Sequence, residues 1–264
     1  MRTGRVLVAE DNEANRLLAL KQLEKLGVAA EAVSDGEEAV AAVAGSAFDL
    51  VFMDRNMPRL DGFAATARIR EGEASVGKHT VIVAMTAGAM DGDRSACLAA
   101  GMDDYLCKPV MMSDLQEMVD RWLPSGRATD DSPERDGAGV DGPAGGGDAA
   151  IEAAAFDALR ASLGDDAFVA SFVDTFLSQL SVRLETLDAS AAAGDGPGLR
   201  FVAHTLKSTS AMLGAARLAR LCSDLEAGPD ESEGRARLVA AIRREAERVQ
   251  AELGPWRDRR RAVA

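Results

Sequence analysis

The chain has 264 residues, of which 47% are hydrophobic and 28% charged, and its formal net charge at pH 7 is −13. This length accommodates two ordinary domains, and the acidic balance gives no indication of nucleic-acid binding. The three cysteines are too few and too scattered for a disulfide framework or a metal site, and no apolar stretch reaches the roughly 18 residues of a membrane span. We therefore expect a cytoplasmic protein that is not inserted in a membrane.

Residues 1–124 alternate short β-like runs with segments of helical periodicity. The predicted strand and helix pairs are 6–9 with 12–26, 29–33 with 37–44, 50–54 with 63–70, 81–86 with 92–100, and 104–107 with 112–123. Strand–helix repeats with short connections favour a parallel sheet covered on both faces. We predict a doubly wound, flavodoxin-like α/β domain whose five strands follow the order 2-1-3-4-5.

The second half of the chain has a different composition. Residues 125–149 are rich in Gly, Pro and acidic side chains and have almost no large apolar ones, which predicts a flexible linker. Residues 150–256 show only helical periodicity, so we predict an all-α domain with one short helix followed by a four-helix bundle. The arginines in 257–264 are interpreted as a solvated basic tail.

The apolar run 50–54 ends in Asp54 and is followed by a loop containing Pro and Gly, so Asp54 is predicted at the carboxyl end of a buried strand. In the predicted strand order, Glu10, Asp11, Thr86 and Lys108 come to the same edge of the sheet. Three neighbouring carboxylates repel one another unless a cation lies among them, and hard oxygen ligands suit Mg²⁺. Phosphorylation of Asp54, with Lys108 and Thr86 holding phosphoryl oxygens, is the predicted chemistry.

Several motifs at these strand ends resemble the response-regulator receiver domain. They are Glu10-Asp11, Asp54, Met57-Pro58, Asp61-Gly62, Thr86-Ala87, Tyr105 and Lys108-Pro109. The resemblance implies Mg²⁺ held by Asp11, Asp54 and the backbone carbonyl of Asn56, with Glu10 either behind them or a direct ligand. It also implies a cis peptide bond before Pro109.

The same resemblance implies a switching role for Thr86 and Tyr105. In the family, the hydroxyl moves toward the phosphoryl group and the aromatic ring turns inward. The change alters the face formed by the fourth strand, the fourth helix and the fifth strand. On the residues alone, Tyr105 could equally be an aromatic side chain on an edge strand.

His204 is the histidine of interest in the helical half, because His79 precedes a strand in a polar loop and is interpreted as a surface residue. A count at about 100° per residue places His204 away from the apolar stripe of its helix, beside Lys207 and Ser208. We therefore predict an exposed imidazole with a neighbouring cation, as a phosphohistidine requires.

The segment 203–215 resembles the signature of a histidine phosphotransfer (HPt) domain, and the predicted bundle extends the resemblance to roughly residues 152–253. Ser208 departs from the glycine that is usual in the family. Phe201 and Met212 are candidates for an apolar docking ring around His204, although packing against the next helix is an equal alternative.

The residues and the two resemblances together predict a phosphorelay protein that carries phosphoryl groups on Asp54 and His204, with self-catalysed phosphorylation and dephosphorylation of Asp54 rather than turnover of a substrate. The expected partners are a sensor histidine kinase and a downstream response regulator. Two alternatives remain open at this point: uncoupled domains, with Asp54 as a phosphate sink or regulator, and a docking protein without phosphate turnover. A haloacid-dehalogenase-like phosphatase is disfavoured, because it needs a second aspartate where this chain has Asn56.

Overall fold

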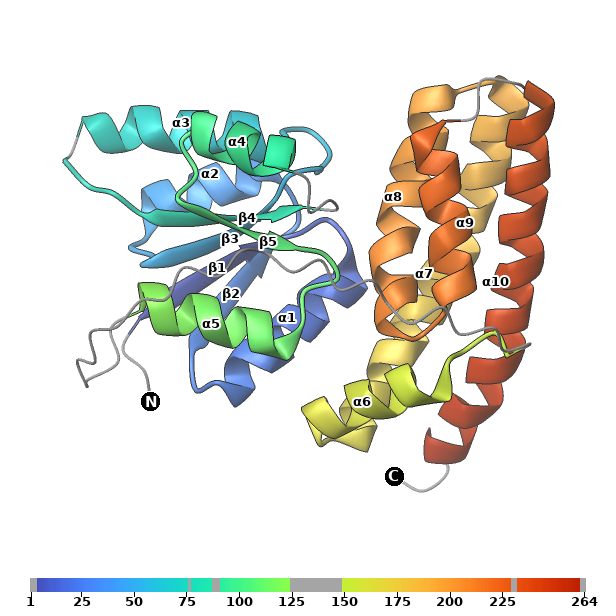
Figure 1. Ribbon diagram of the computed structural model, residues 1–264. Coiled ribbons are helices and arrows are strands. Elements are labelled where there is room, and N and C mark those ends of the chain that lie inside the picture. Colours follow the sequence, from blue (N-terminus) through green and yellow to red (C-terminus); the bar gives the residue numbers. More distant parts are fainter. Residues whose placement is uncertain (1–3, 76, 87–90, 124–148, 229–231, 262–264) are drawn as a thin grey trace. The chain divides into compact units, whose positions relative to one another are not determined.

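The computed structural model describes residues 4–75, 77–86, 91–123, 149–228 and 232–261 (Figure 1). The chain divides into two compact units, Met1–Gly142 and Pro143–Ala264. The predicted linker 125–149 lies outside the described residues except for its last position. Within the described part of the chain, no helix is both long enough and apolar enough to cross a membrane.

The first unit is the predicted doubly wound α/β domain. Its five strands are all parallel and follow the order β2-β1-β3-β4-β5, which confirms the prediction. The strands are β1 (Arg5–Ala9), β2 (Ala29–Val33), β3 (Leu50–Asp54), β4 (Val81–Thr86) and β5 (Asp104–Cys107). The helices are α1 (Glu13–Lys25), α2 (Gly36–Gly45), α3 (Gly62–Ala74), α4 (Asp91–Ala99) and α5 (Met112–Trp122).

Successive strand residues point to opposite sides of the sheet, and helices cover the apolar side chains on both faces. Val6 and Phe52 belong to the apolar cluster shared with α1 and α5, whereas Leu7 and Met53 belong to the cluster shared with α2, α3 and α4 (Figure 1). Continuous apolar strands are therefore needed at the centre of the sheet. Only the carboxyl ends of these strands are left to carry polar chemistry.

The turn after β3 holds the strand end in a fixed position. Asp61 caps α3 by accepting a hydrogen bond from the Ala64 amide at 2.8 Å. Gly62 follows, and a Cβ atom built on it would lie 2.3 Å from the carbonyl oxygen of Asp54. This close approach of two backbones requires glycine, so the Asp61-Gly62 pair fixes the start of α3 directly against Asp54.

In the second unit, the regular elements among the described residues are all helices. They are α6 (Ala153–Leu163), α7 (Asp166–Ala193), α8 (Gly196–Met212), α9 (Ala216–Ala227) and α10 (Ser232–Arg261). A left-handed Gly194 ends α7, and Asp195 caps α8 by accepting from the Gly198 amide at 3.0 Å. The glycines and aspartates in the connection thus allow α8 to return along α7, and the predicted short helix and four-helix bundle are confirmed (Figure 1).

The C-terminal segment differs from the predicted basic tail, because α10 continues through Arg261. The last turns are held by Trp256, whose ring packs edge-on against Phe156 of α6 at a centroid distance of 5.0 Å. The Arg160 guanidinium lies 5.8 Å from the centroid of the same ring. Arg257 pairs with Asp174 at 3.3 Å, so at least this arginine is part of the domain.

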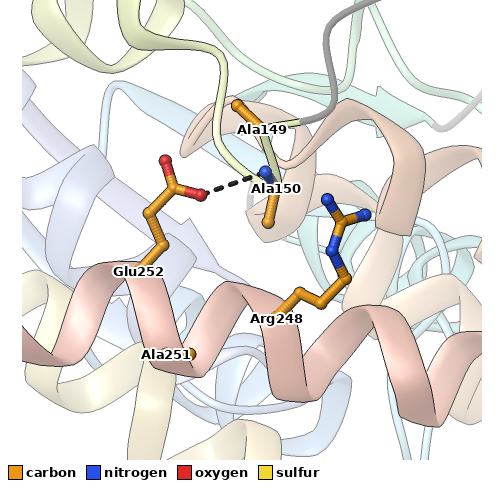
Figure 2. A pocket seen from close by; sticks show the side chains of 5 residues that line it. All are labelled: Ala149, Ala150, Arg248, Ala251 and Glu252. Carbon is orange, nitrogen blue, oxygen red and sulfur yellow. Dashed lines mark hydrogen bonds between the residues drawn. The ribbon is translucent and has the colours of Figure 1, made fainter.

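The segment that enters the bundle is tied to α10 and to the turn between α8 and α9. Glu252 of α10 accepts hydrogen bonds from the amides of Ala150 and Ile151 at 3.0 and 3.3 Å (Figure 2). The Glu152 amide donates to the carbonyl of Gly214, between α8 and α9, at 2.8 Å. A pocket of about 320 Å³ lies beside this segment, lined by Ala149, Ala150, Arg248, Ala251 and Glu252 (Figure 2).

Candidate functional site

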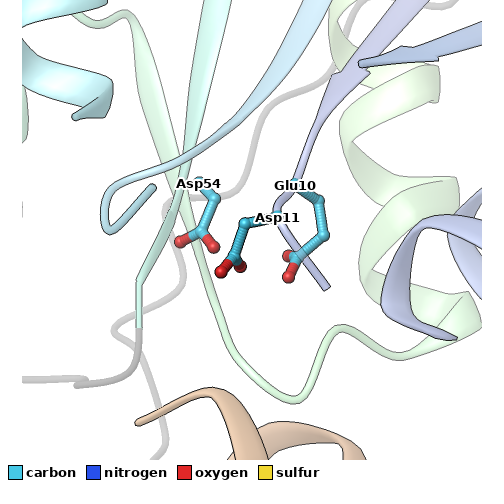
Figure 3. Close-up of side chains that lie close together, drawn as sticks. All are labelled: Glu10, Asp11 and Asp54. Atoms are coloured by element: carbon cyan, nitrogen blue, oxygen red, sulfur yellow. The ribbon is translucent and has the colours of Figure 1, made fainter. Parts of the chain in front are cut away.

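Three carboxylates meet at the carboxyl edge of the parallel sheet, as predicted. Glu10 and Asp11 follow β1, and Asp54 ends the neighbouring strand β3 (Figure 3). Each offers a ligand oxygen, and these oxygens lie within 4.8 Å of one another. Glu10 and Asp54 are almost fully buried, at 3% and 1% exposed. This set of hard oxygen donors fits a small divalent cation such as Mg²⁺.

Lys108 lies between two of these carboxylates. Its Nζ is 2.6 Å from Oε2 of Glu10 and 2.7 Å from Oδ2 of Asp54, and the side chain is only 5% exposed. The peptide bond between Lys108 and Pro109 is cis, as the resemblance implied. Burial alone would lower the pKa of Lys108, but the charges of Asp54 and Glu10 outweigh burial and raise it, so the lysine is a permanent cation.

Glu10 has hydrogen-bond partners on both carboxylate oxygens. Its Oε1 accepts from the Asn12 amide at 3.3 Å and from Nδ2 of Asn15 at 3.0 Å, while Oε2 accepts from Lys108. Burial raises the pKa of Glu10, and the nearby charge of Asp54 raises it further, although Lys108 opposes both. Glu10 and Asp54 therefore share the ammonium group of Lys108 between them.

The other predicted residues of this domain lie near the same edge. Thr86 ends β4 and is buried, one residue beyond Met85, the register partner of Asp54. The backbone amide of Asn56 donates to Oδ1 of Asp54 at 3.2 Å, which places Asn56 directly beside the acceptor. Tyr105 is half-buried in β5 against the cluster beneath α2, α3 and α4, and the Arg94 guanidinium lies 5.9 Å from its ring centroid.

The prediction that His204 is exposed is wrong. The His204 side chain is 9% exposed, and its Nδ1 lies 2.6 Å from Oε1 of Glu226 at the end of α9. The angular count correctly separated His204 from the main apolar stripe of α8, but α9 packs against that side of the helix. A periodicity count on one helix contains no information about which neighbouring helix covers each side.

Glu226 also holds the cation beside His204. Its Oε2 is 2.5 Å from Nζ of Lys207, so one carboxylate joins the two predicted residues. Burial would raise the pKa of Glu226, but the hydrogen bonds and charges of His204 and Lys207 lower it to about 2. Glu226 is therefore ionised at neutral pH, and its carboxylate lies within hydrogen-bond distance of Nδ1 of His204.

The surroundings of His204 are mixed. Ser208 is buried at 4% exposed, whereas Phe201, one turn before His204, is 40% exposed. Met212 is half-buried. Phe201 thus belongs to the surface, as a docking residue requires, and Met212 is partly used in packing.

Sequence reasoning missed Glu226, which contacts His204, and Arg16, which contacts the backbone of Glu10 and Asp11. Glu226 lies near the end of α9, directly after the last leucine of its apolar stripe. An acidic residue there does not indicate a contact with His204 unless the position of α8 is known. Arg16 gave a weak signal: it is a cation in the first turns of α1, where the helix dipole favours anions. Its guanidinium Nη1 donates to the backbone carbonyls of Glu10 and Asp11 at 2.7 and 2.9 Å.

Fold and geometry thus define a two-domain protein with a carboxylate cluster at the sheet edge of an α/β domain and a histidine–carboxylate–lysine cluster in a helical bundle. The response regulator receiver domain model matches residues 6–120, and the Hpt domain model matches residues 171–252. The chain therefore contains a receiver domain followed by an Hpt domain, and it is a phosphotransfer signalling protein.

Relatives with both regions include the sensor protein GacS of Pseudomonas syringae, which is 35% identical over 85% of this chain and 24% of its own length. The virulence sensor protein BvgS of Bordetella bronchiseptica is 29% identical over 97% of this chain and 21% of its own length. This chain therefore spans only about a quarter of the length of these relatives.

Similar solved structures cover one domain of this chain. The magnesium-bound receiver domain of the sensor histidine kinase PA1611 from Pseudomonas aeruginosa is 40% identical, with a TM-score of 0.42, over 45% of this chain and 96% of that one. A complex of Saccharomyces cerevisiae Ypd1 with the receiver domain of Ssk1 matches with 31% identity and a TM-score of 0.44, over 46% of this chain and 89% of that one.

Proposed function

We propose that this protein is a phosphorelay component that accepts a phosphoryl group on Asp54 and carries one on His204. The observation that supports this most directly is the pairing of two complete acceptor sites on one chain. Asp54 has two acidic neighbours and Lys108, and His204 has Glu226 and Lys207. Neither arrangement is needed for folding alone, because buried charges cost more than apolar packing.

At the receiver site, the proposed ligands of Mg²⁺ are Asp11, Asp54 and the backbone carbonyl of Asn56. When bound, the cation would neutralise negative charge on the phosphoryl oxygens. A carboxylate oxygen of Asp54 attacks phosphorus, the bond from phosphorus to the donor atom breaks, and the electron pair returns to the donor. Lys108, whose Nζ lies 2.7 Å from Oδ2 of Asp54 in the structure, places its positive charge beside the transferred phosphoryl group. Thr86 and Tyr105 are proposed to respond to that group.

At the bundle site, Nε2 of His204 is the proposed nucleophile. Glu226 keeps the proton on Nδ1 and compensates the positive charge that the ring acquires when the bond from Nε2 to phosphorus forms. Lys207 lies on the same carboxylate and is placed to attract the phosphoryl oxygens. The reverse step breaks that bond and returns the electron pair to Nε2.

The proposed partners are a histidine kinase upstream and a response regulator downstream. Relatives described as a sensor protein and as hybrid signal transduction histidine kinases support this placement. In the proposed order, the kinase phosphorylates Asp54, His204 takes the group, and the regulator receives it. Self-catalysed phosphorylation of Asp54 from small donors and self-catalysed loss of the group are part of the same proposal.

Labelling tests the proposal. Wild type, Asp54→Asn and His204→Gln are incubated with Mg²⁺ and either a labelled small phosphoryl donor or a phosphorylated kinase. An acyl phosphate on Asp54 is lost in base and a phosphohistidine in acid. We expect base-labile label to disappear in Asp54→Asn and acid-labile label in His204→Gln.

The order of transfer is read from the same variants. Acid-labile label that appears in wild type but not in Asp54→Asn supports flow from Asp54 to His204. Equal acid-labile label in both proteins supports the uncoupled alternative, in which His204 is served by another relay. Wild type that takes up no label with any donor would favour a docking protein and contradict the proposal.

A further inference from the structure

Arg16 contacts the main chain directly behind the acidic pair of the receiver domain. One guanidinium nitrogen, Nη1, donates to the carbonyl of Glu10 at 2.7 Å and to that of Asp11 at 2.9 Å. Both residues follow the last strand residue of β1, and the Glu10 amide still donates to the carbonyl of Val33 at the end of β2, at 3.2 Å. A single side chain therefore joins the two peptide units from which the acidic side chains project.

Capping of α1 does not explain the presence of Arg16. The helix start is already capped by Asn12, whose Oδ1 accepts from the amides of Ala14 and Asn15 at 2.9 and 3.3 Å. A cation near a helix N-terminus is disfavoured by the helix dipole. The contacts of Arg16 with the two carbonyls are what offset this cost.

The preceding residue of α1, Asn15, contacts the side chain of Glu10. Asn15 holds the carboxylate of Glu10, with Nδ2 3.0 Å from Oε1. Arg16 instead holds the backbone, and the backbone angles decide where the side chains of Glu10 and Asp11 can point. The convergence of the acidic oxygens within 4.8 Å thus depends on two successive residues of one helix turn.

We propose that Arg16 is a positioning residue that fixes the backbone of Glu10 and Asp11 and thereby sets the affinity of the acidic site for a divalent cation. This inference rests on the proposed metal site. The loss of backbone positioning and the loss of positive charge predict opposite effects of removing Arg16 on the affinity for a divalent cation. Loss of a nearby cation strengthens binding of a divalent cation, whereas a loosened backbone weakens it. The sign of the change therefore reveals which effect dominates.

The test measures binding of Mn²⁺ to the full chain from the electron paramagnetic resonance signal of the free ion. Arg16→Met keeps an apolar stem and removes the donors, and we expect affinity to fall about 10-fold, as for other residues that orient metal ligands. The matched control is Lys21→Gln, which removes one positive charge from the same helix, where Lys21 pairs with Glu24 at 3.1 Å. The control is expected to bind Mn²⁺ at least as tightly as wild type.

A second readout separates positioning from a general loss of structure. At saturating Mg²⁺, phosphorylation of Arg16→Met by a small donor should return to within about twofold of the wild-type rate, because the defect is in metal binding. Thermal unfolding checks that the variant is folded. A lower melting temperature with unchanged Mn²⁺ affinity would show a purely structural role and overturn the proposal.

Two further outcomes are decisive. If Arg16→Met does not fold, Arg16→Lys replaces it, because lysine keeps the charge without the planar fork of donors. Wild-type Mn²⁺ affinity in that variant, or affinity at or above wild type in Arg16→Met, overturns the role of Arg16. Wild-type protein that does not bind Mn²⁺ contradicts the metal site itself, which is a failure of the proposed function and is distinguishable from the other results.

Discussion

Replacing Glu226 by glutamine removes the one carboxylate that holds both His204 and Lys207. Glutamine has nearly the same size, so the packing of α9 against α8 is retained. It has one acceptor oxygen and no charge, whereas the native side chain accepts from Nδ1 of His204 at 2.6 Å and from Nζ of Lys207 at 2.5 Å. At least one of these two donors loses its partner in Glu226→Gln.

The magnitude follows from the pKa of Glu226. Burial raises this pKa, but the contacts of His204 and Lys207 bring it from 4.5 to about 2. At 1.36 kcal/mol per pH unit this difference is ~3 kcal/mol. The side chain is 27% exposed, so solvent screening reduces the expected contribution to about 1–2 kcal/mol.

The sign with pH follows from linkage. Because the pKa of Glu226 is lowered in the folded state, its stabilisation is fully present above the unfolded value of 4.5 and is lost as the pH falls toward about 2. Wild type should therefore exceed Glu226→Gln in unfolding free energy by about 1–2 kcal/mol at pH 7. The difference should shrink toward zero near pH 2.

Urea unfolding followed by tryptophan fluorescence measures this difference. The chain has two tryptophans, Trp122 in the receiver domain and Trp256 in the bundle, so a Trp122→Phe background makes the signal specific to the bundle. The matched control is Asp224→Asn, an exposed position on the same helix with the same chemical change. We expect no pH-dependent difference for that control.

The same variant should accept phosphoryl groups on His204 about 10- to 150-fold more slowly, because a hydrogen bond to a charged partner is worth about 1.5–3 kcal/mol and 1.36 kcal/mol is a factor of ten in rate. The rate is measured with a phosphorylated receiver as donor. The reasoning is refuted by an unfolding difference that stays constant between pH 7 and pH 2.5 together with an unchanged transfer rate. Such a result would show that Glu226 acts neither through its charge nor on the imidazole.

Three other changes test the remaining parts of the structure. Lys108→Met leaves two buried carboxylates without their cation and should destabilise the receiver domain by about 3–5 kcal/mol. Differential scanning calorimetry measures this loss, and added Mg²⁺ should restore part of it. An unchanged stability would contradict the ion pair between Lys108 and Asp54. Gly62→Ala places a methyl group 2.3 Å from the Asp54 carbonyl and should cost about 1–3 kcal/mol in urea unfolding, whereas alanine at an open position such as Gly45 should cost less. Trp256→Ala removes the edge-on contact with Phe156 and should lower the unfolding free energy of the bundle by about 1.5–3 kcal/mol. Urea titrations followed by circular dichroism measure this value. An unchanged unfolding free energy would mean that the end of α10 does not stabilise the domain.

The sheet order and the position of Asp54 could be predicted because both depend on local signals. A run of four apolar residues before Asp54, a loop containing Pro and Gly, and strand–helix repeats with short connections are enough to place Asp54 at the carboxyl edge of a doubly wound sheet. Lys108 came to the same edge by the same argument. The hydrogen bond between Glu10 and Asn15 could not be predicted, because it depends on how α1 begins against the end of β1.

The environment of His204 depends on packing between helices, and this is where prediction from the sequence was wrong. Angular position on α8 is a property of one helix, whereas burial by α9 depends on the turn between them. Glu226 is 22 residues beyond His204, and no periodicity links the two. The contact of Trp256 with Phe156 was missed for the same reason, since it joins helices at opposite ends of the bundle sequence.

The two proposed acceptor sites have opposite charge arrangements, and the chemistry of each acceptor explains why. Asp54 is an anion that must approach an anionic phosphoryl group, and a cation, Lys108, lies between it and a second carboxylate. His204 attacks as a neutral ring and becomes positive, and an anion, Glu226, lies between it and a cation. In each site the neighbouring charge is opposite in sign to the charge at the phosphorylated acceptor. If both proposed acceptors are phosphorylated, each has electrostatic support, and we therefore expect the partners to set the direction of phosphoryl flow.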